Sequence, residues 1–131
     1  MKKLNTHLEI DNTLSGKVVT LDSGYARVVL HTTNAMRADR FGLVHGGFVF
    51  SAADFAAMSA VNDENVVLGG ANVKFIAPVR VGEVVIFEAK VKDIKGKKRV
   101  INVVGKVEEK EVFKGEFTAF VLDKHVLRVA K

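Results

Sequence analysis

The sequence predicts an α+β domain in which six antiparallel strands curl around one long central helix. Residues 48–61 are mostly apolar, contain no Gly or Pro, and would form a helix roughly 21 Å long. Two segments of strand-like composition precede this run and four follow it, separated by short polar or Gly-containing joins. Strands wrapped around the helix would explain why it has no wide polar face.

The length and composition suit one globular domain over residues 1–131. The chain is 48% hydrophobic and 27% charged, and it contains no internal repeat, linker or cysteine. The lack of cysteine means no disulfide framework, which fits a reducing compartment. The N-terminus lacks the apolar core of a signal peptide, and no apolar run is long enough to span a membrane. These features predict a cytoplasmic protein without a membrane partner.

The charge balance alone excludes little. The chain has 20 basic and 15 acidic residues, a net charge of +5. That excess is compatible with nucleic acid, anionic lipid, a phosphorylated small molecule or simply a solvated basic surface. Because no helix-turn-helix pattern or aromatic-basic stripe is present, we expect no nucleic-acid partner. The histidines show no metal-ligand spacing, so we expect no metal site.

The first two strands form a predicted β-hairpin. Residues 16–22 and 25–32 flank a turn-forming Ser-Gly pair. In the second strand, alternate residues share one face, which we expect to point toward the core. These residues are Ala26, Val28 and Leu30.

The central run is predicted to be a helix. A strand is the competing interpretation, but the length of the run and its alanines favour the helix. Between Gly46 and Val61 the only charged residue is Asp54. A carboxylate among apolar residues is costly unless something pairs with it or uses it. Asp54 is therefore either a structural hydrogen-bonding group or a functional residue, and we favour function.

Four further strands are predicted after the helix. Their short joins, RVG, KGK and EKE, favour antiparallel neighbours. Apolar residues fall on both faces of the last strand, which indicates that part of its outer face is covered. Open sheet edges and exposed sheet faces are usually resolved by pairing with a second copy. We therefore expect a homodimer, and a dimer of dimers remains open. The four strands are residues 66–78, 82–94, 98–109 and 111–123.

The order of these elements and the motif HGGFVFSAAD resemble the hotdog-fold acyl-CoA thioesterases, in particular the branch of the phenylacetate-pathway and mammalian enzymes. The resemblance covers residues 16–123. The family motif runs Asn, two residues, Gly, two residues, His-Gly-Gly, and then an acidic residue nine places after the His. A second match is FIAPVRVGE, with the aromatic residue, Pro and Gly-Glu pair common in the family. The first motif is matched by Gly42, His45, Gly46, Gly47 and Asp54.

The resemblance implies hydrolysis of an acyl-CoA thioester without a metal or an organic cofactor. It implies that the amide of Gly46 stabilises the oxyanion, which suits an unpaired N–H at a helix start. Asp54 would be the nucleophile or the general base. The two residues lie about 12 Å apart along one helix, so one helix cannot easily present both to one carbonyl. A two-fold dimer that joins Gly46 of one chain to Asp54 of the other solves this, and the resemblance implies the same.

Other residues take supporting roles. His45 is expected to position the loop before the helix, as in the family, and Gly47 allows substrate close to the backbone, although two glycines also fit a tight turn. Asp39 stands where the family has Asn; a carboxylate can hold a water there but cannot donate from an amide. Phe48 and Phe50 are available to line an apolar acyl pocket or to fill the core. Candidates for the CoA phosphates are Arg37, Arg40, Arg80, Lys97, Lys98 and Arg99.

A second hypothesis keeps the fold but not the chemistry: a hotdog dimer that senses or carries acyl-CoA without hydrolysing it. Asp39 favours this alternative, as does the segment VLGGAN, which has no hydroxyl where some family members place Ser or Thr. A hotdog dehydratase is less favoured, because those enzymes place a catalytic His in a different local pattern. A panel of acyl-CoAs with product detection separates hydrolysis from binding alone.

Overall fold

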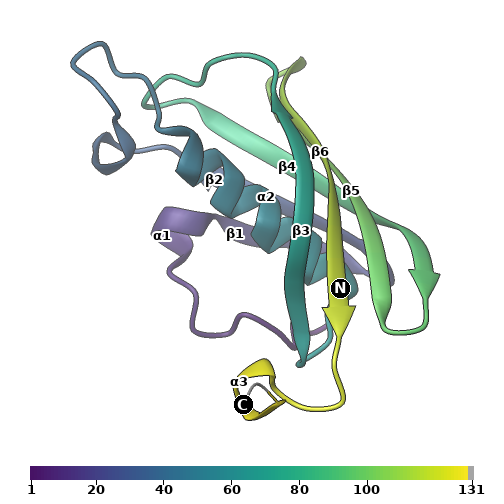
Figure 1. Cartoon of the computed structure of the whole chain (residues 1–131). Coiled ribbons are helices and arrows are strands. Elements are labelled where there is room, and N and C mark those ends of the chain that lie inside the picture. The colour runs from purple at the N-terminus through teal and green to yellow at the C-terminus, as the bar shows by residue number, and fades with distance from the viewer. Residues whose placement is uncertain (130–131) are drawn as a thin grey trace.

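The computed structural model describes residues 1–129 and shows one six-stranded antiparallel sheet curved around helix α2 (Gly46–Val61), as drawn in Figure 1. The predicted α+β class and the wrapped central helix are confirmed. Three short helices complete the described chain: α1 (Asn12–Ser15), η1 (Asn34–Met36) and α3 (Val126–Val129). The strands are β1 (Lys17–Asp22), β2 (Tyr25–His31), β3 (Val66–Phe75), β4 (Val84–Lys95), β5 (Lys98–Val107) and β6 (Lys110–Val121).

The first hairpin forms as its pattern predicts. β1 and β2 pair antiparallel, and Gly24 takes the left-handed backbone conformation (φ 69°) that the tight turn needs. The alternation in β2 is also confirmed, because Ala26, Val28 and Leu30 are completely buried. The apolar face of the hairpin therefore packs inward, and its polar face points away from α2.

The sheet order is β1-β2-β4-β5-β6-β3, which corrects one expectation from the short joins. The β4–β5 and β5–β6 connections are antiparallel hairpins, as predicted. β3 and β4 are not neighbours: β3 pairs with β6 at one edge, and residues 76–83 carry the chain across the end of the sheet (Figure 1). Pro78 lies in this crossing, where it cannot donate to a strand ladder. The crossing is held at the start of α2, because the N–H of Val44 donates to the carbonyl of Val79 at 2.8 Å.

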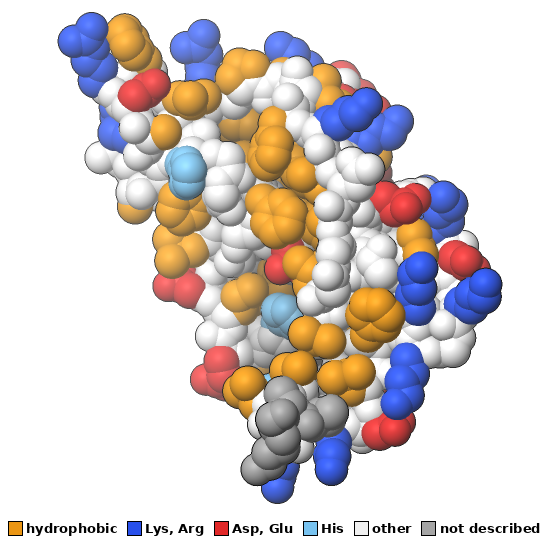
Figure 2. Space-filling view, in the orientation of Figure 1, with side chains coloured by type: hydrophobic (Ala, Val, Ile, Leu, Met, Phe, Trp, Pro, Cys, Tyr) orange, Lys and Arg blue, Asp and Glu red, His pale blue; other side chains and the backbone are white. Residues whose placement is uncertain are grey.

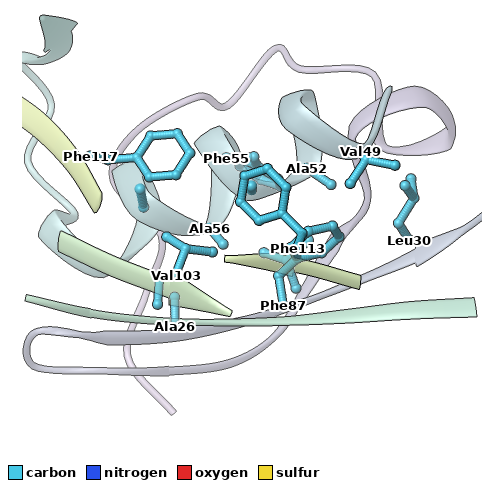
Figure 3. Close-up of a cluster of buried hydrophobic side chains, with 14 of the residues drawn as sticks. Ala26, Leu30, Val49, Ala52, Phe55, Ala56, Phe87, Val103, Phe113 and Phe117 are labelled. Atoms are coloured by element: carbon cyan, nitrogen blue, oxygen red, sulfur yellow. The ribbon is translucent and has the colours of Figure 1, made fainter. Parts of the chain in front are cut away.

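The core lies between α2 and the concave face of the sheet. Figure 3 shows aromatic side chains from the strands packed against small residues of the helix, such as Ala52 and Ala56. Because alanines present little bulk, large phenylalanines from the sheet can approach the helix closely. The side chains on the opposite face of α2 are not fully buried. The largest buried aromatic residues are Phe55, Phe87, Phe113 and Phe117.

The segment before β1 covers part of α2, an arrangement that the sequence pattern does not predict. Asn62, which ends the helix in a left-handed conformation, accepts from the N–H of Asn5 at 2.7 Å and donates to the carbonyl of Lys3 at 2.9 Å. The His7 ring lies 6.0 Å from the ring of Phe55. This segment therefore covers the C-terminal half of α2, and through α1 it also reaches the middle of the helix, where the hydroxyls of Ser15 and Ser51 lie 2.7 Å apart.

Apolar surface remains along one side of the molecule. Figure 2 shows a stripe of hydrophobic side chains down the middle of the face where α2 and β3 lie in Figure 1. Within the described chain β3 pairs only with β6, so its other edge is open, and Phe75 at its end is 53% exposed. None of the helices in residues 1–129 has the length and hydrophobicity needed to cross a membrane.

Candidate functional site

Asp54 lies in the middle of α2 on the helix face that the sheet leaves open. Gly47, Phe50 and Ser51 share this face, because they stand seven, four and three residues before Asp54. The Oδ1 atom of Asp54 is buried, and no atom of residues 1–129 forms a hydrogen bond with it. Burial raises the pKa of the Asp54 carboxyl to about 6. Within one chain, therefore, Asp54 is a desolvated carboxylate without a compensating partner.

The start of α2 is uncapped by side chains. His45 is the N-cap residue, but its side chain forms no capping hydrogen bond, and the first turn contains no acidic residue. The backbone N–H of His45 donates to the carbonyl of Met36 at 2.8 Å, which fixes the approach of the chain to the helix. The first helical N–H groups have no intrahelical acceptor and carry the positive end of the helix dipole. This end of the helix can therefore bind an anionic oxygen.

Gly46 and Gly47 are both packed against rings. A Cβ added to Gly46 would lie 3.4 Å from the Cε1 atom of Phe75, and one added to Gly47 would lie 3.1 Å from the ring of His45. Neither glycine has a positive φ angle. The contact at Gly46 is therefore of ordinary van der Waals length, whereas a side chain at Gly47 would need the His45 ring to shift.

An apolar cavity of about 290 Å³ opens beside Gly46. It lies where α2, the end of β3 and the crossing segment 76–83 meet. Phe48 and Phe50, expected as possible lining residues, do not line it. The Phe48 ring lies 6.2 Å from that of His45, and the Phe50 ring lies 5.5 Å from that of Phe117. The cavity is lined by Leu43, Val44, Gly46, Val49, Phe75, Ile76, Ala77, Pro78, Val79 and Val112.

Sequence reasoning missed most of these lining residues. The available signal was the motif FIAPVRVGE, which covers residues 75–83. Reading it as part of the cavity requires knowing that residues 76–83 cross the sheet end, and only the tertiary structure shows that.

Asp54 does not line the cavity at Gly46. Asp54 is eight positions after Gly46 on the helix, which is a rise of about 12 Å. The structure of one chain thus has the predicted spacing but does not bring the carboxylate to the helix start.

Asp39 lies in an exposed loop and binds its own backbone. Its Oδ1 atom accepts from the N–H of Phe41 at 2.9 Å and from the N–H of Leu43 at 3.2 Å. Both bonds are of the side-chain-to-backbone type that holds tight turns. The visible role of Asp39 in this chain is to fix the shape of the loop.

The predicted phosphate-binding residues fall into two groups that one chain does not bring together. Arg37, Arg40 and Arg80 lie near the start of α2, where Arg37 pairs with Val44 and Arg80 pairs with Leu43 in isolated β-bridges. The others lie at the β4–β5 hairpin. Lys98 pairs with Phe120 of β6, and Phe120 pairs with Val67 of β3, so this hairpin lies near the first residues of β3. The ten residues of β3 separate the two ends by about 30 Å. The hairpin group is Lys97, Lys98 and Arg99.

The hairpin group also has local partners. Lys97 forms a 3.1 Å ion pair with Asp123, and Arg99 donates to the carbonyl of Gly96 at 2.8 Å. Ser51, a residue that sequence reasoning did not single out, lies 2.7 Å from Ser15 through their hydroxyls, one helical turn before Asp54. Among the described residues no group of three His, Cys, Asp or Glu side chains is placed to hold a metal ion.

Comparison with known families places this site in context. Residues 41–114, which include the start of α2 and Asp54, match the model of the thioesterase superfamily. A methylthioribose-1-phosphate isomerase of Aquifex aeolicus is 54% identical over 92% of this chain but only 26% of its own length. The transcription factor FapR of a Thermoanaerobacter species is 31% identical over 86% of this chain and 57% of its own length. The chain thus spans about a quarter of the first relative and little more than half of the second.

Solved structures share the whole fold. An uncharacterised protein from Pyrococcus horikoshii superposes with a TM-score of 0.95 and 45% identity, covering 96% of this chain and 97% of its own. A hypothetical thioesterase from Streptococcus pneumoniae, solved with coenzyme A, superposes with a TM-score of 0.75 over 83% of this chain and 87% of its own. At 18% identity the second comparison shows a common fold only.

Proposed function

The chain belongs to the thioesterase superfamily and has its hotdog fold, and on that premise we propose that it hydrolyses acyl-CoA thioesters at sites shared between two subunits. The observation that carries this proposal is the pairing of two unsatisfied groups on one helix. The buried Oδ1 atom of Asp54 has no hydrogen-bond partner within residues 1–129, and the start of α2 has no side-chain cap. In the proposed reaction, the helix start binds the carbonyl oxygen of the thioester, and the carboxylate activates the nucleophile.

The helix start polarises the thioester. In this proposal the carbonyl oxygen of the substrate accepts the N–H of Gly46, where the helix dipole favours the negative charge that develops during attack. One such donor contributes on the order of 3 kcal/mol to transition-state stabilisation. Gly46 suits this assignment, because a residue without a side chain leaves its backbone amide open to the substrate.

Asp54 activates the nucleophile. With a pKa of about 6, the carboxyl is largely ionised at neutral pH, yet it is basic enough to take a proton from water. Water then forms the new C–O bond, the C–S bond breaks, and the proton passes to the departing thiolate. Direct attack by the carboxylate, followed by hydrolysis of an anhydride, uses the same residue. Neither route requires a metal or an organic cofactor.

The apolar cavity beside Gly46 is the proposed acyl site. Its lining contains no charged side chain, so it favours an uncharged acyl group. Its volume of about 290 Å³ is at the low end for small-molecule sites, which favours a short or medium-length chain over a long one.

A homodimer is part of the proposal, because about 12 Å of helix separates Gly46 from Asp54 in one chain. The open edge of β3 and the hydrophobic stripe of Figure 2 support a second copy on this side. Isologous contact places residues of each chain reciprocally against the other, so a dimer would contain two equivalent sites.

Mixing two inactive variants tests this arrangement. Asp54→Asn and Gly46→Val are each expected to lose activity. If they are unfolded together and refolded at equal amounts, half of the dimers are mixed, and each mixed dimer has one intact site. Recovery of about a quarter of wild-type activity is therefore expected from random pairing. No recovery, with dimers formed, would show that each site lies within a single chain.

A second candidate function is acyl-CoA sensing without hydrolysis. The similarity to a transcription factor favours it, as does Asp39, whose Oδ1 atom is engaged by the loop backbone. A panel of acyl-CoAs, followed by free-thiol detection and by calorimetry, separates the two functions. Thiol release supports the thioesterase; saturable binding without thiol release supports the sensor.

A further inference from the structure

The loop before α2, residues 37–43, projects from the body of the molecule at the upper left of Figure 1. Figure 2 shows basic and hydrophobic side chains together on this projection. Phe41 is 74% exposed, the largest exposure of any phenylalanine in the described chain. The guanidinium carbon of Arg40 lies 4.8 Å from the centre of the Phe41 ring, a cation–π arrangement that holds the guanidinium against the ring.

The loop is rigidly built although its tip is exposed. The N–H of Ala38 donates to the carbonyl of Leu43 at 2.7 Å, which closes the loop at its base. Asp39 accepts two backbone N–H groups, including that of Phe41 itself. Arg37 donates through Nε to Asn34 at 2.7 Å and through Nη1 to the carbonyl of Asp39 at 3.0 Å. A single exposed apolar side chain needs no explanation, but one carried on a loop backbone that this many hydrogen bonds fix is preorganised for contact.

The charge around the loop favours an anionic partner. No acidic side chain lies within 4 Å of the Arg40 or Arg80 guanidinium in the described part of the chain, since the ion pairs there involve other residues. The Oδ1 atom of Asp39 accepts two backbone N–H groups, and the Oε1 atom of Glu83 accepts the backbone N–H of Arg80 at 2.7 Å. The side chains of both arginines are therefore free to bind a phosphate.

The loop tip is also at a suitable distance from the proposed reaction centre. Gly46 is five positions after Phe41, so their backbones are at most about 18 Å apart. In coenzyme A, about 13 bonds join the sulfur to the nearest phosphorus, which spans about 15 Å at the rise per bond of an extended amide chain. A thioester bound at Gly46 can therefore place its phosphates and base at the tip.

We propose that Arg40 and Phe41 form the binding site for the nucleotide end of coenzyme A, an inference that rests on the proposed function. Phe41 stacks on the adenine with the ring face opposite Arg40, and Arg40 binds a phosphate. Stacking on an exposed aromatic ring and contact with a planar guanidinium are the interactions that nucleotides favour. Asp39 acts as a positioning residue, because it holds the backbone of Phe41 without touching the ligand.

Calorimetric titration of the whole chain with coenzyme A and with pantetheine, which lacks the nucleotide, tests this site. Phe41→Ala and Arg40→Gln should each weaken coenzyme A binding about tenfold and leave pantetheine binding unchanged. Phe41→Trp, which keeps a stacking ring, should restore affinity for coenzyme A. Ile94→Ala is the matched control, since Ile94 is 63% exposed on β4, far along the sheet; it should bind as wild type.

The outcomes separate this inference from the proposed function. If coenzyme A binding depends on Phe41 but the protein hydrolyses no acyl-CoA, the nucleotide site is supported and the thioesterase function is refuted. If the protein hydrolyses acyl-CoA but both loop variants bind coenzyme A with unchanged affinity, the nucleotide site is refuted and the thioesterase function is supported. Dissociation of the dimer in Phe41→Ala, with affinity for coenzyme A unchanged, also overturns it and makes Phe41 a subunit contact.

Discussion

Replacing Asp54 with Asn should make the protein more stable at neutral pH and much less active. Burial raises the pKa of this carboxyl from 3.8 to about 6, so the folded state binds its proton more tightly than the unfolded chain does. The ionised carboxylate therefore destabilises the fold, and this penalty grows as pH rises from about 4 to 6 and is complete above 6. A rise in the pKa from 3.8 to about 6 corresponds to about 3 kcal/mol. Asn keeps the shape of the side chain and removes the charge.

Urea denaturation at pH 7.5 and at pH 3.5, at one protein concentration, measures this difference. Asp54→Asn should raise the free energy of unfolding by about 3 kcal/mol at pH 7.5 and by almost nothing at pH 3.5. Thioester hydrolysis should fall by at least about a hundredfold, because the base is lost. Glu109→Gln, which neutralises an exposed carboxylate in the β5–β6 turn, should change neither quantity. Equal or lower stability of Asp54→Asn at pH 7.5 would refute the reasoning, since it would mean that the native carboxylate has a strong partner.

Three further measurements address the chemistry, the loop and the core. Because the ionised form of Asp54 is the active one, kcat/KM should rise about tenfold per pH unit up to about pH 6 and then level off; a flat profile from pH 4.5 to 7 would remove Asp54 as the base. Asp39→Asn keeps an Oδ1 acceptor for both loop N–H groups and should bind coenzyme A like wild type, whereas Asp39→Ala should bind it several-fold more weakly; equal affinity in Asp39→Ala would contradict the positioning role. Gly105→Ala would place a Cβ 2.7 Å from the buried ring of Phe87 and should lower the unfolding free energy by about 1–3 kcal/mol, while Gly70→Ala meets no atom within 4 Å and should not; equal stability of the two variants by urea denaturation would show that the core can shift.

Local pattern was sufficient for the elements that have a clear period. Alternation in β2 identified its buried face, and the uninterrupted apolar run identified α2, since each depends on residues close in sequence. The place of β3 was not predictable in this way. A short join normally links neighbouring strands, but here the turn of the chain at Pro78 and its contact with the start of α2 send it across the sheet. That choice is set by tertiary packing, which no local window contains.

The residues of the candidate site likewise fall into those that local sequence pattern identifies and those that it does not. Gly46 and Asp54 were identifiable because both break the local pattern, one as a glycine at a helix start and the other as a charge among apolar residues. The cavity residues Ile76 and Val112 were not, because ordinary apolar residues carry no signal of the space beside them. Asp39 was noticed as a departure from a motif, but its two hydrogen bonds to loop backbone become visible only in three dimensions.

The unsatisfied groups on α2 are complementary, which is the strongest physical reason to expect a second copy on this face. The helix start offers N–H donors and a positive dipole end without an acidic cap, and the middle of the helix offers a buried carboxylate oxygen without a donor. A rigid helix cannot bring together two points about 12 Å apart on its own length. Two-fold symmetry can, because any contact from one helix to the other occurs twice. Two such helices packed side by side would place the helix start of each chain near the Asp54 carboxylate of its partner. A thioester carbonyl and a water would fill the gap between them.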